Sequence, residues 1–420
     1  MRLATRLSAL LRPAATPWQP DRIVALDLAR FLALLGMFSE HLLLGKAPGP
    51  VLAVVTGFPS TLFAVLGGVS VVVSTRRLLE EGRTLAACVS VAVRGVLLAL
   101  IGLALGAVPS FIVMVLSYYG VALIVVACLI WLPTGALLTL AATLTLASPH
   151  LILWARSTGP TGAIPFPSLA SPLDFLQTVL FTGFYPGVTW ITFLLFGVCA
   201  GRLLVRAARP RRAALTLLLS GAVMAAAGAT ADLLSRPLVT AALIATGQTA
   251  DKARELTTAQ GFGTPLGGGW IAVLSAAPHT GTTADILRTG GVALFVLAVL
   301  LLLVPLLRSP LPLPLAVVAR AGSAPLTLYV AHFFGIDALI LLTILVPTKG
   351  APWWSFGPGA IAIHTAAALA VGAYLLRTGR RGPLEAFISR RVHAVADRLP
   401  GGALAPARSR SRSREMPPLR

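Results

Sequence analysis

Ten apolar runs follow one another along this chain, and each is about 20 residues long, the length that a helix needs to cross a bilayer. They cover roughly 24–44, 51–74, 85–108, 112–132, 134–154, 178–201, 213–234, 285–307, 323–346 and 357–376. The runs do not alternate with the period of two that barrel strands show. Within a bilayer only helices and closed barrels satisfy the backbone hydrogen bonds. We therefore expect an all-α, polytopic integral membrane protein of about ten transmembrane helices.

The composition agrees with a bilayer environment. Only 11% of the residues are charged, against about 25% in soluble domains, and the mean hydropathy is +0.86. The net charge of +20 could suggest a nucleic-acid partner. The basic residues lie instead in short blocks between apolar runs, where they set topology, so we expect no nucleic acid. Cys88, Cys128 and Cys199 lie inside apolar runs, without the spacing of a metal site, and we expect no bound metal.

The basic blocks also predict orientation. With the N-terminus inside, the inner segments hold 25 of the 34 lysines and arginines and the outer segments hold seven, as the positive-inside rule requires. Both termini are then cytoplasmic, and the first run, which no cleavage motif follows, is a retained signal anchor. This divides the chain into a cytoplasmic segment (1–23), a transmembrane domain (24–376) with outer loops near 155–177 and 235–284, and a basic, partly disordered tail (377–420). The LVTAALIATG stretch of the second loop could form a short re-entrant or surface helix.

The first run carries four ionisable residues, Asp27, Arg30, Glu40 and His41. A charge at the bilayer centre costs about 2.5–3.5 kcal/mol on insertion scales, so each needs a partner or a function. Asp27 and Arg30 are neighbours on one helix face. Arg30 and His41 face the same way about 16 Å apart along the axis. Two interpretations stay open: a structural ion pair with an interfacial histidine, or a polar stripe that lines a route across the membrane.

Other polar residues within or beside the runs raise the same choice. Arg94 needs a carboxylate, carbonyl or anionic ligand, or it is a counter-ion for Asp27 or a snorkelling side chain. His279 lies in the outer motif APHTGT, where proline and glycine fix the loop, or it is simply exposed. His332 follows Tyr329 by three residues on one helix face, or it is a satisfied core histidine.

The remaining histidines and several aromatic residues have simpler interpretations. We interpret His150 and His364 as structural. Four aromatic residues near run ends are typical of interfacial belts: Tyr118, Tyr119, Tyr185 and Trp190. The sequence has no P-loop, dinucleotide-binding glycine fingerprint, HExxH or CxxC motif, which argues against ATP-driven transport and the common metal hydrolases.

The segment RIVALDLARFLALLGMFSEH resembles the opening signature of the heparan-α-glucosaminide N-acetyltransferase-like membrane acyltransferases and their bacterial relatives. Their first helix carries an Arg-x-x-x-x-Asp-x-x-Arg pattern, which is matched here by Arg22, Asp27 and Arg30, whereas Phe31 stands where the relatives usually have Gly. The Arg30–His41 spacing is also similar to that of the separate acyltransferase-3 family, whose His is regarded as catalytic. Further segments resemble landmarks of the first family in the same order: TLFAVLGGVSVVV, LSYYGVALI, TGFYPGVTW, AAPHTGT, GSAPLTLYVAH and RGPLEAFISR.

This resemblance implies a multi-pass acyltransferase of the bacterial cytoplasmic membrane. It would move an acyl group, an acetyl group in the first instance, from cytosolic acyl-CoA to an extracytoplasmic glycan, lipid or envelope acceptor. Acyl-CoA would be a donor substrate, with no permanently bound cofactor, and membrane lipids would be further partners. His41 and Glu40 are the expected catalytic residues. The residues expected to bind substrate are Asp27, Arg30, Arg94, His279, Tyr329 and His332.

Two other functions remain compatible with the sequence. Ionisable residues inside the membrane also serve as proton or substrate relays, so the alternative is a proton-coupled small-molecule transporter or a lipid flippase. No inverted repeat of the kind common in transporters is visible. A structural or regulatory membrane protein without turnover is the third possibility, and binding of acyl-CoA would separate the first function from the other two.

Overall fold

The protein is described by a computed structural model that covers residues 23–43, 55–110, 112–159, 161–162, 171–266, 270–307, 311–346, 350 and 352–399. This part of the chain is helical and contains no strand, apart from one isolated bridge between Gly162 and Gly183. The prediction of an all-α, polytopic membrane protein is confirmed. The segments 1–22 and 400–420, which hold most of the expected N-terminal segment and the ARSRSRSRE tract, lie outside the described residues.

The helices follow one another with short connections. They are α2 (Val24–Leu42), α4 (Phe58–Glu80), α5 (Thr84–Gly106), α6 (Leu116–Ala127), α7 (Thr134–Thr158), α8 (Pro172–Gln177), η2 (Thr178–Thr182), α9 (Gly187–Arg206), α10 (Pro210–Ala245), α11 (Ala250–Leu256), η3 (Trp270–Leu274), α12 (Thr283–Leu303), η4 (Val304–Leu306), α13 (Leu313–Gly322), α14 (Pro325–Leu345), α15 (Pro358–Thr378) and α16 (Pro383–Ala396).

Eight of the described helices are long and apolar enough to cross a membrane: α4, α5, α7, α9, α10, α12, α14 and α15. Two of the ten expected spans correspond to other elements. The run 24–44 is the 19-residue α2, whose charged residues Asp27, Arg30 and Glu40 are spread along the whole helix. The run 112–132 contains α6, which has only 12 residues. The expected cytoplasmic location of both termini stays a prediction.

Three of the expected spans have wrong boundaries. The run expected at 51–74 forms α4, which starts at Phe58 after Gly57 and continues to Glu80. The run 178–201 begins as the five-residue π-helix η2, and α9 starts only at Gly187, because Pro186 cannot continue a helix from the preceding turn. The helix α10 continues through Pro237 to Ala245, so LVTAALIATG forms its last turns and no separate helix. Tertiary packing explains this continuation, because Val239 and Leu243 lie in a small apolar cluster with Ala253 of α11.

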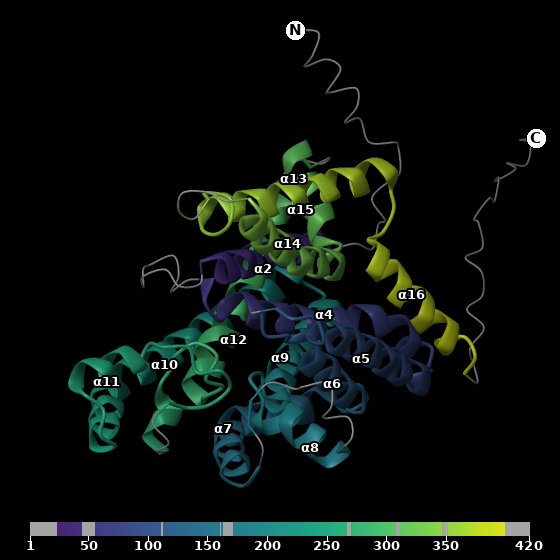
Figure 1. Cartoon of the computed structure of the whole chain (residues 1–420). Helices are drawn as coiled ribbons and strands as arrows, with labels where there is room; N and C mark the ends of the chain where they lie inside the picture. The colour runs from purple at the N-terminus through teal and green to yellow at the C-terminus, as the bar shows by residue number, and fades with distance from the viewer. Residues whose placement is uncertain are drawn as a thin grey trace, which may run out of the picture.

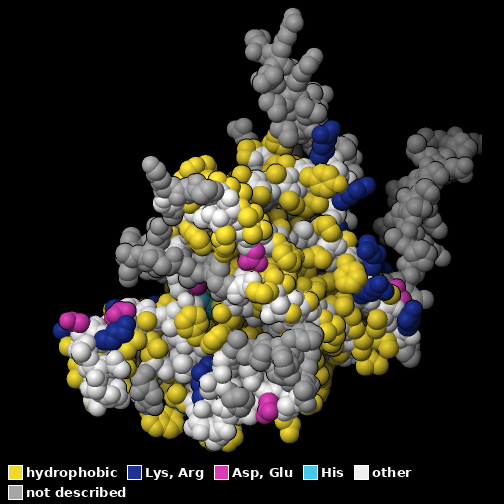
Figure 2. All heavy atoms as spheres, viewed as in Figure 1, with side chains coloured by type: hydrophobic (Ala, Val, Ile, Leu, Met, Phe, Trp, Pro, Cys, Tyr) yellow, Lys and Arg dark blue, Asp and Glu magenta, His cyan; other side chains and the backbone are white. Residues whose placement is uncertain are grey.

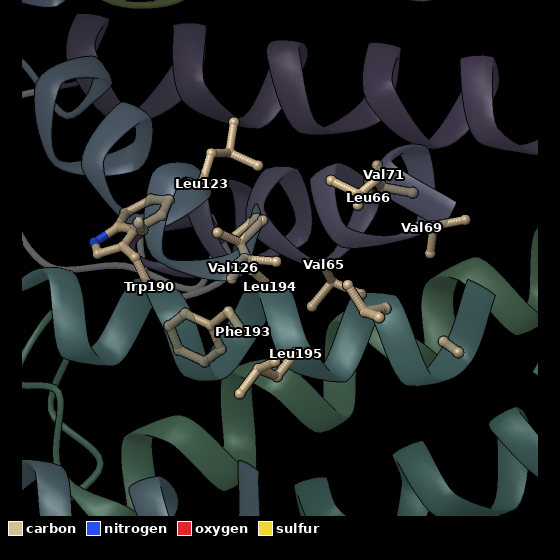
Figure 3. Close-up of a cluster of buried hydrophobic side chains, with 14 of the residues drawn as sticks. Val65, Leu66, Val69, Val71, Leu123, Val126, Trp190, Phe193, Leu194 and Leu195 are labelled. Atoms are coloured by element: carbon tan, nitrogen blue, oxygen red, sulfur yellow. The ribbon is translucent and has the colours of Figure 1, made fainter. Parts of the chain in front are cut away.

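The core of the bundle joins helices that are distant in sequence. Figure 3 shows side chains of α4, α6 and α9 in contact, including Val65, Leu123 and Leu194. The backbones of α4 and α9 approach each other closely where Gly68 faces Gly197: a Cβ atom on Gly68 would lie 2.1 Å from the carbonyl oxygen of Leu194. Small residues allow such close packing of membrane helices, where dispersion contacts rather than hydrophobic burial hold helices together.

The helix α2 lies between two groups of helices (Figure 1). One group is formed by α13, α14 and α15, and the other contains α4, α5 and α9. Hydrophobic side chains cover much of the visible surface, and Lys and Arg side chains gather on the side where α16 lies (Figure 2). We call this the basic end; it also holds the last turns of α4 and α9, with Arg77 and Arg206. The opposite end, where α2 finishes, is the loop end.

Candidate functional site

The charged residues of α2 near the basic end form a connected group. Arg30 lies 2.8 Å from the carboxylate of Asp27, which is buried, as expected for residues three apart on a helix. A second nitrogen of Arg30 donates to the hydroxyl of Ser70 on α4 at 2.7 Å. The guanidinium is therefore held between two helices, with a fixed orientation.

A cavity of about 340 Å³ opens beside Arg30. Its walls are largely apolar, but Arg30 of α2 and Arg94 of α5 both line it. No hydrogen bond or ion pair to Arg94 occurs within the described residues, so a second cation faces the cavity without a counter-ion. Tyr119, Trp190 and Tyr329 line it as well. Two arginines in an apolar chamber favour an anionic ligand, because phosphate and carboxylate groups accept charge-assisted hydrogen bonds from guanidinium.

The amphipathic helix α16 lies along the basic end of this cavity, where Glu385 and Ser389 line it. The carboxylate of Glu385 accepts hydrogen bonds from the backbone N–H groups of Leu326 at 2.7 Å and Thr327 at 3.1 Å. These N–H groups belong to the first turn of α14, where a carboxylate is favoured by the helix dipole. Glu385 thus fixes α16 to α14 and is no free counter-ion for the arginines.

At the loop end, α2 carries the second polar group. Nε2 of His279 donates to the carboxylate of Glu40 at 3.0 Å, and both side chains are nearly buried. These two residues are 239 positions apart in the sequence. Their contact brings the loop motif APHTGT onto the last turn of α2, next to His41.

The loop around His279 is held rigidly. Asp232 of α10 accepts a hydrogen bond from the backbone N–H of Ala276 at 2.7 Å. Thr282 caps α12 by accepting from the N–H of Asp285 at 3.0 Å and donates to the carbonyl of Ser275. His279 itself has a φ of 56°, in the left-handed region that a non-glycine residue adopts at a conformational cost. The loop bonds impose this backbone geometry and direct the ring towards α2.

The His279–Glu40 contact changes the acid–base behaviour of the loop histidine. Burial lowers the pKa of His279, but the adjacent carboxylate of Glu40, its hydrogen bond and the charge of Asp285 raise it, and the net pKa lies above 6.5. Burial raises the pKa of the neighbouring Tyr185, and the charge of Glu40 adds to this effect. Near neutral pH, Tyr185 is therefore a neutral hydroxyl beside a His279–Glu40 pair that favours the charged form.

His41, the next residue of α2 after Glu40, contacts a histidine of another helix. Its Nδ1 atom lies 3.2 Å from Nε2 of His332 on α14, and the two rings are nearly parallel. The ring of His332 in turn lies 4.8 Å from that of His364 on α15, edge to face. Three histidines from three helices thus form a row at the loop end of α2.

A small pocket of about 30 Å³ lies beside His279. Ser60 and Trp190 line both this pocket and the large cavity, so the two spaces adjoin at these residues. Within the described residues, two buried polar atoms of the small pocket, Oγ1 of Thr189 and Oδ1 of Asp285, have no hydrogen-bond partner. A ligand with hydroxyl or amine groups would satisfy them.

The structure brings the expected site residues together in two groups. Arg30, Arg94 and Tyr329 line the large cavity, with Asp27 paired to Arg30. At the loop end, Glu40 contacts His279 and His41 contacts His332. His41 does not line the large cavity, although it was expected to share the face of Arg30.

Four aromatic residues of this site have a location that differs from the one predicted from the sequence. Trp190 is buried and lines both spaces, so its assignment to an interfacial belt is wrong; the same holds for Tyr118, which is buried. The belt assignment is also wrong for Tyr119, which lines the large cavity, and for Tyr185, which lines the small pocket. Trp190 follows Pro186 by four residues, and a proline-broken helix start was the one signal that could have indicated a pocket there.

The sequence was also compared with known proteins. No family model matches it, and no match was found among curated proteins. The acyltransferase resemblance therefore depends on the motifs and their order, and the function has to be argued from the site.

Proposed function

We propose that this protein is a membrane acyltransferase that moves an acetyl group from acetyl-CoA, bound at the basic end, to a polar acceptor at the loop end. The observation that carries the proposal is the adjacency of two different spaces. A cavity with two arginines meets a small pocket beside a His–Glu pair, and Ser60 and Trp190 line both.

The large cavity suits the donor. Acetyl-CoA carries phosphate groups at one end and a thioester at the other, joined by a largely uncharged arm. Arg94, which lacks a counter-ion in the described residues, and Arg30 would bind phosphate oxygens. The apolar wall that runs from these arginines to Trp190 would hold the arm. The thioester would then lie near Ser60, where the cavity adjoins the small pocket.

The loop end suits the acceptor. Nearly buried His279 and Glu40 and the unpartnered polar atoms of Thr189 and Asp285 offer donors and acceptors to a sugar, lipid or envelope hydroxyl or amine. We assign the proton transfer to His41, which lines neither space but follows Glu40 directly and is partly exposed at the end of α2. A histidine is the side chain best suited to general base catalysis near neutral pH.

The proposed reaction is a direct transfer of the acetyl group through one tetrahedral intermediate. The acceptor oxygen or nitrogen attacks the thioester carbon while His41 takes the acceptor proton. The tetrahedral intermediate collapses, the carbon–sulfur bond breaks, and the CoA thiolate takes the proton from His41. Tyr185, whose pKa is raised so that it keeps its proton, lines the small pocket and would donate a hydrogen bond to the developing oxyanion.

The direct test uses purified protein in proteoliposomes with radiolabelled acetyl-CoA and a bacterial envelope extract as acceptor. We expect labelled product from the wild type and none from His41→Ala. Thermal unfolding of the variant serves as the folding control. Absence of acetyl-CoA binding by the folded wild-type protein would overturn the assignment of the donor, and binding without product would leave the acceptor assignment in error.

A transporter has weaker support. A transported polar molecule would have to pass Trp190 and a pocket of about 30 Å³, whereas an acyltransferase passes only an uncharged two-carbon group. Proton-coupled uptake by the same proteoliposomes, with no acetyl-CoA binding, would favour the transporter.

A further inference from the structure

The row of three histidines at the loop end has a defined hydrogen-bond direction. Nδ1 of His364 lies 2.9 Å from the carbonyl oxygen of Ala360, one turn earlier on α15. A carbonyl oxygen can only accept, so Nδ1 of His364 carries the hydrogen. No carboxylate pairs with His364 among the described residues, and an unpaired buried cation is costly. A neutral His364 therefore has a bare lone pair on Nε2.

That lone pair faces α14 next to His332. A Cβ atom on Gly335, one turn after His332, would lie 2.8 Å from Nε2 of His364. Within the described part of the chain, Nε2 of His364 and Nδ1 of His332 are both buried and have no hydrogen-bond partner. The rings are 4.8 Å apart. A small rotation would let these two atoms satisfy each other, provided that Nδ1 of His332 carries a hydrogen.

The tautomer of His332 then determines the tautomer of His41. If Nδ1 of His332 is the protonated atom, its Nε2 atom has a lone pair and accepts from Nδ1–H of His41 across the 3.2 Å contact. The reverse tautomer of His332 would place two buried lone pairs, on His332 and His364, against each other with no donor between them. That arrangement leaves two buried acceptors unsatisfied, which is unfavourable.

We propose that His364 is a positioning residue that sets the tautomer of His41 through His332. Every N–H of the row donates along it, from His41 to His332, then to His364 and finally to the Ala360 carbonyl. The lone pair left open is that of Nε2 of His41. For the acyl transfer proposed above, on which the catalytic meaning of this inference rests, Nε2 is then the atom that takes the acceptor proton.

The surroundings keep the row ordered. The ring of Phe38, one turn before His41 on α2, lies 4.3 Å from that of His332 and 6.1 Å from that of His364. Phe38 is buried, so it shields the inner two histidines from water that could exchange their tautomers. The nearby charged groups lie around the small pocket, where Glu40 is paired with His279 and Asp285 lines the wall.

The tautomer can be measured directly. The full-length protein in nanodiscs, with ¹⁵N-labelled histidine, gives long-range ¹⁵N–¹H correlations that distinguish Nδ1–H from Nε2–H rings. The His41 signals are assigned as those lost in His41→Gln among the six histidines. We expect the Nδ1–H tautomer for His41 in the wild type. An Nε2–H ring at His41 in the wild type would overturn the proposal, whatever the activity.

Variants of His364 separate positioning from packing. A glutamine carries its amide oxygen near the place of Nε2, whereas asparagine reaches only the place of Nδ1. We expect His364→Gln to keep the wild-type tautomer of His41, and His364→Asn to shift part of the His41 population to Nε2–H. Gly335→Ala keeps all three histidines in the sequence, but its Cβ atom would displace Nε2 of His364. This variant should therefore give the same spectrum as His364→Asn. Identical spectra for all three variants and the wild type would contradict the relay.

Kinetics add a readout that separates this inference from the proposed function. We expect His364→Asn and Gly335→Ala to lower kcat about fivefold, the factor for one neutral hydrogen bond, with KM for acetyl-CoA unchanged. His364→Gln should retain kcat. A wild type with the expected tautomer but no acetyl transfer would refute the proposed function and leave the relay standing. If His364→Asn and Gly335→Ala raise KM for acetyl-CoA but leave kcat unchanged, the relay is refuted and the proposed acyltransferase function is not affected.

Discussion

Replacement of Arg94 by glutamine separates a ligand-binding cation from a structural one. Arg30 already has two protein partners, Asp27 and Ser70, whereas Arg94 has no hydrogen bond or ion pair within the described residues and lines the cavity. Arg94→Gln therefore removes a positive charge from an apolar chamber without breaking a protein contact. We expect the melting temperature to stay the same or to rise, because an unpaired cation in a weakly solvated place is unfavourable.

The expected loss appears in ligand binding. A hydrogen bond to a charged group contributes about 1.5–3 kcal/mol, and every 1.4 kcal/mol corresponds to about a factor of ten in Kd. If Arg94 binds one phosphate oxygen of acetyl-CoA, its loss should weaken binding by roughly 10- to 150-fold. Isothermal titration of the protein in nanodiscs with acetyl-CoA measures this directly.

The control is Arg77→Gln, which removes an equal charge at the basic end from an exposed arginine that is paired with Glu81 and lies outside the cavity. We expect this variant to change Kd less than about threefold, because exposed ion pairs contribute little. Equal weakening by both variants would mean that only the general positive potential matters. A marked drop in melting temperature for Arg94→Gln with unchanged Kd would refute the reasoning and make Arg94 structural.

Three further outcomes follow from the geometry. The pKa of His279 lies above 6.5. The His279–Glu40 pair therefore stabilises the fold fully below pH 6.5, and this stabilisation is lost as the pH rises through the folded-state pKa of His279. Glu40→Gln should flatten the dependence of melting temperature on pH in this range. Gly68→Ala should lower the free energy of unfolding by about 1–3 kcal/mol, because its Cβ atom would meet the α9 backbone. Gly135→Ala is the control and should not lower it, because nothing lies within 4 Å of a Cβ atom there. Equal melting temperatures of the two variants would contradict the close packing. Ser60 lines both spaces. Ser60→Leu should reduce acetyl transfer about 100-fold, because the thioester is misplaced, and should change the Kd of acetyl-CoA little. Normal turnover of this variant would exclude transfer of the acetyl group beside Ser60.

Local patterns in the sequence predict the parts of the site that lie within one helix. The Asp27–Arg30 pair follows from the three-residue spacing, and it forms at 2.8 Å. The apolar run lengths place most helices to within a few residues. The predicted common face of Arg30 and His41 does not put both on one cavity, because the cavity ends at Trp190 and Ser60 while His41 turns towards α14.

Local sequence patterns do not predict contacts between helices that are distant in the sequence. Nothing local indicates that Glu40 meets His279, 239 residues away, or that His364 lies beside His332. Pro237 shows the same limit in secondary structure: its local preference predicts a break, but packing of Val239 and Leu243 against α11 extends α10 past it. In each case the side-chain partner comes from another helix, and one sequence does not contain the pairing information.

The separation of charge along α2 favours transfer of a group over transport of a molecule. Fixed cations lie at one end, on Arg30 and Arg94, and titratable side chains lie at the other, on His41 and His279. The cavity wall between them is largely apolar, and Trp190 and Ser60 line both this cavity and the small pocket. A charged or highly polar solute would lose its hydration there, at a cost of several kcal/mol. An acetyl group would lose little, because it carries no charge and, under the proposed function, the phosphates of its donor would stay at the arginines. Under the proposed function, the two substrates would stay in their own halves of the bundle, and only the acyl carbon would reach the boundary.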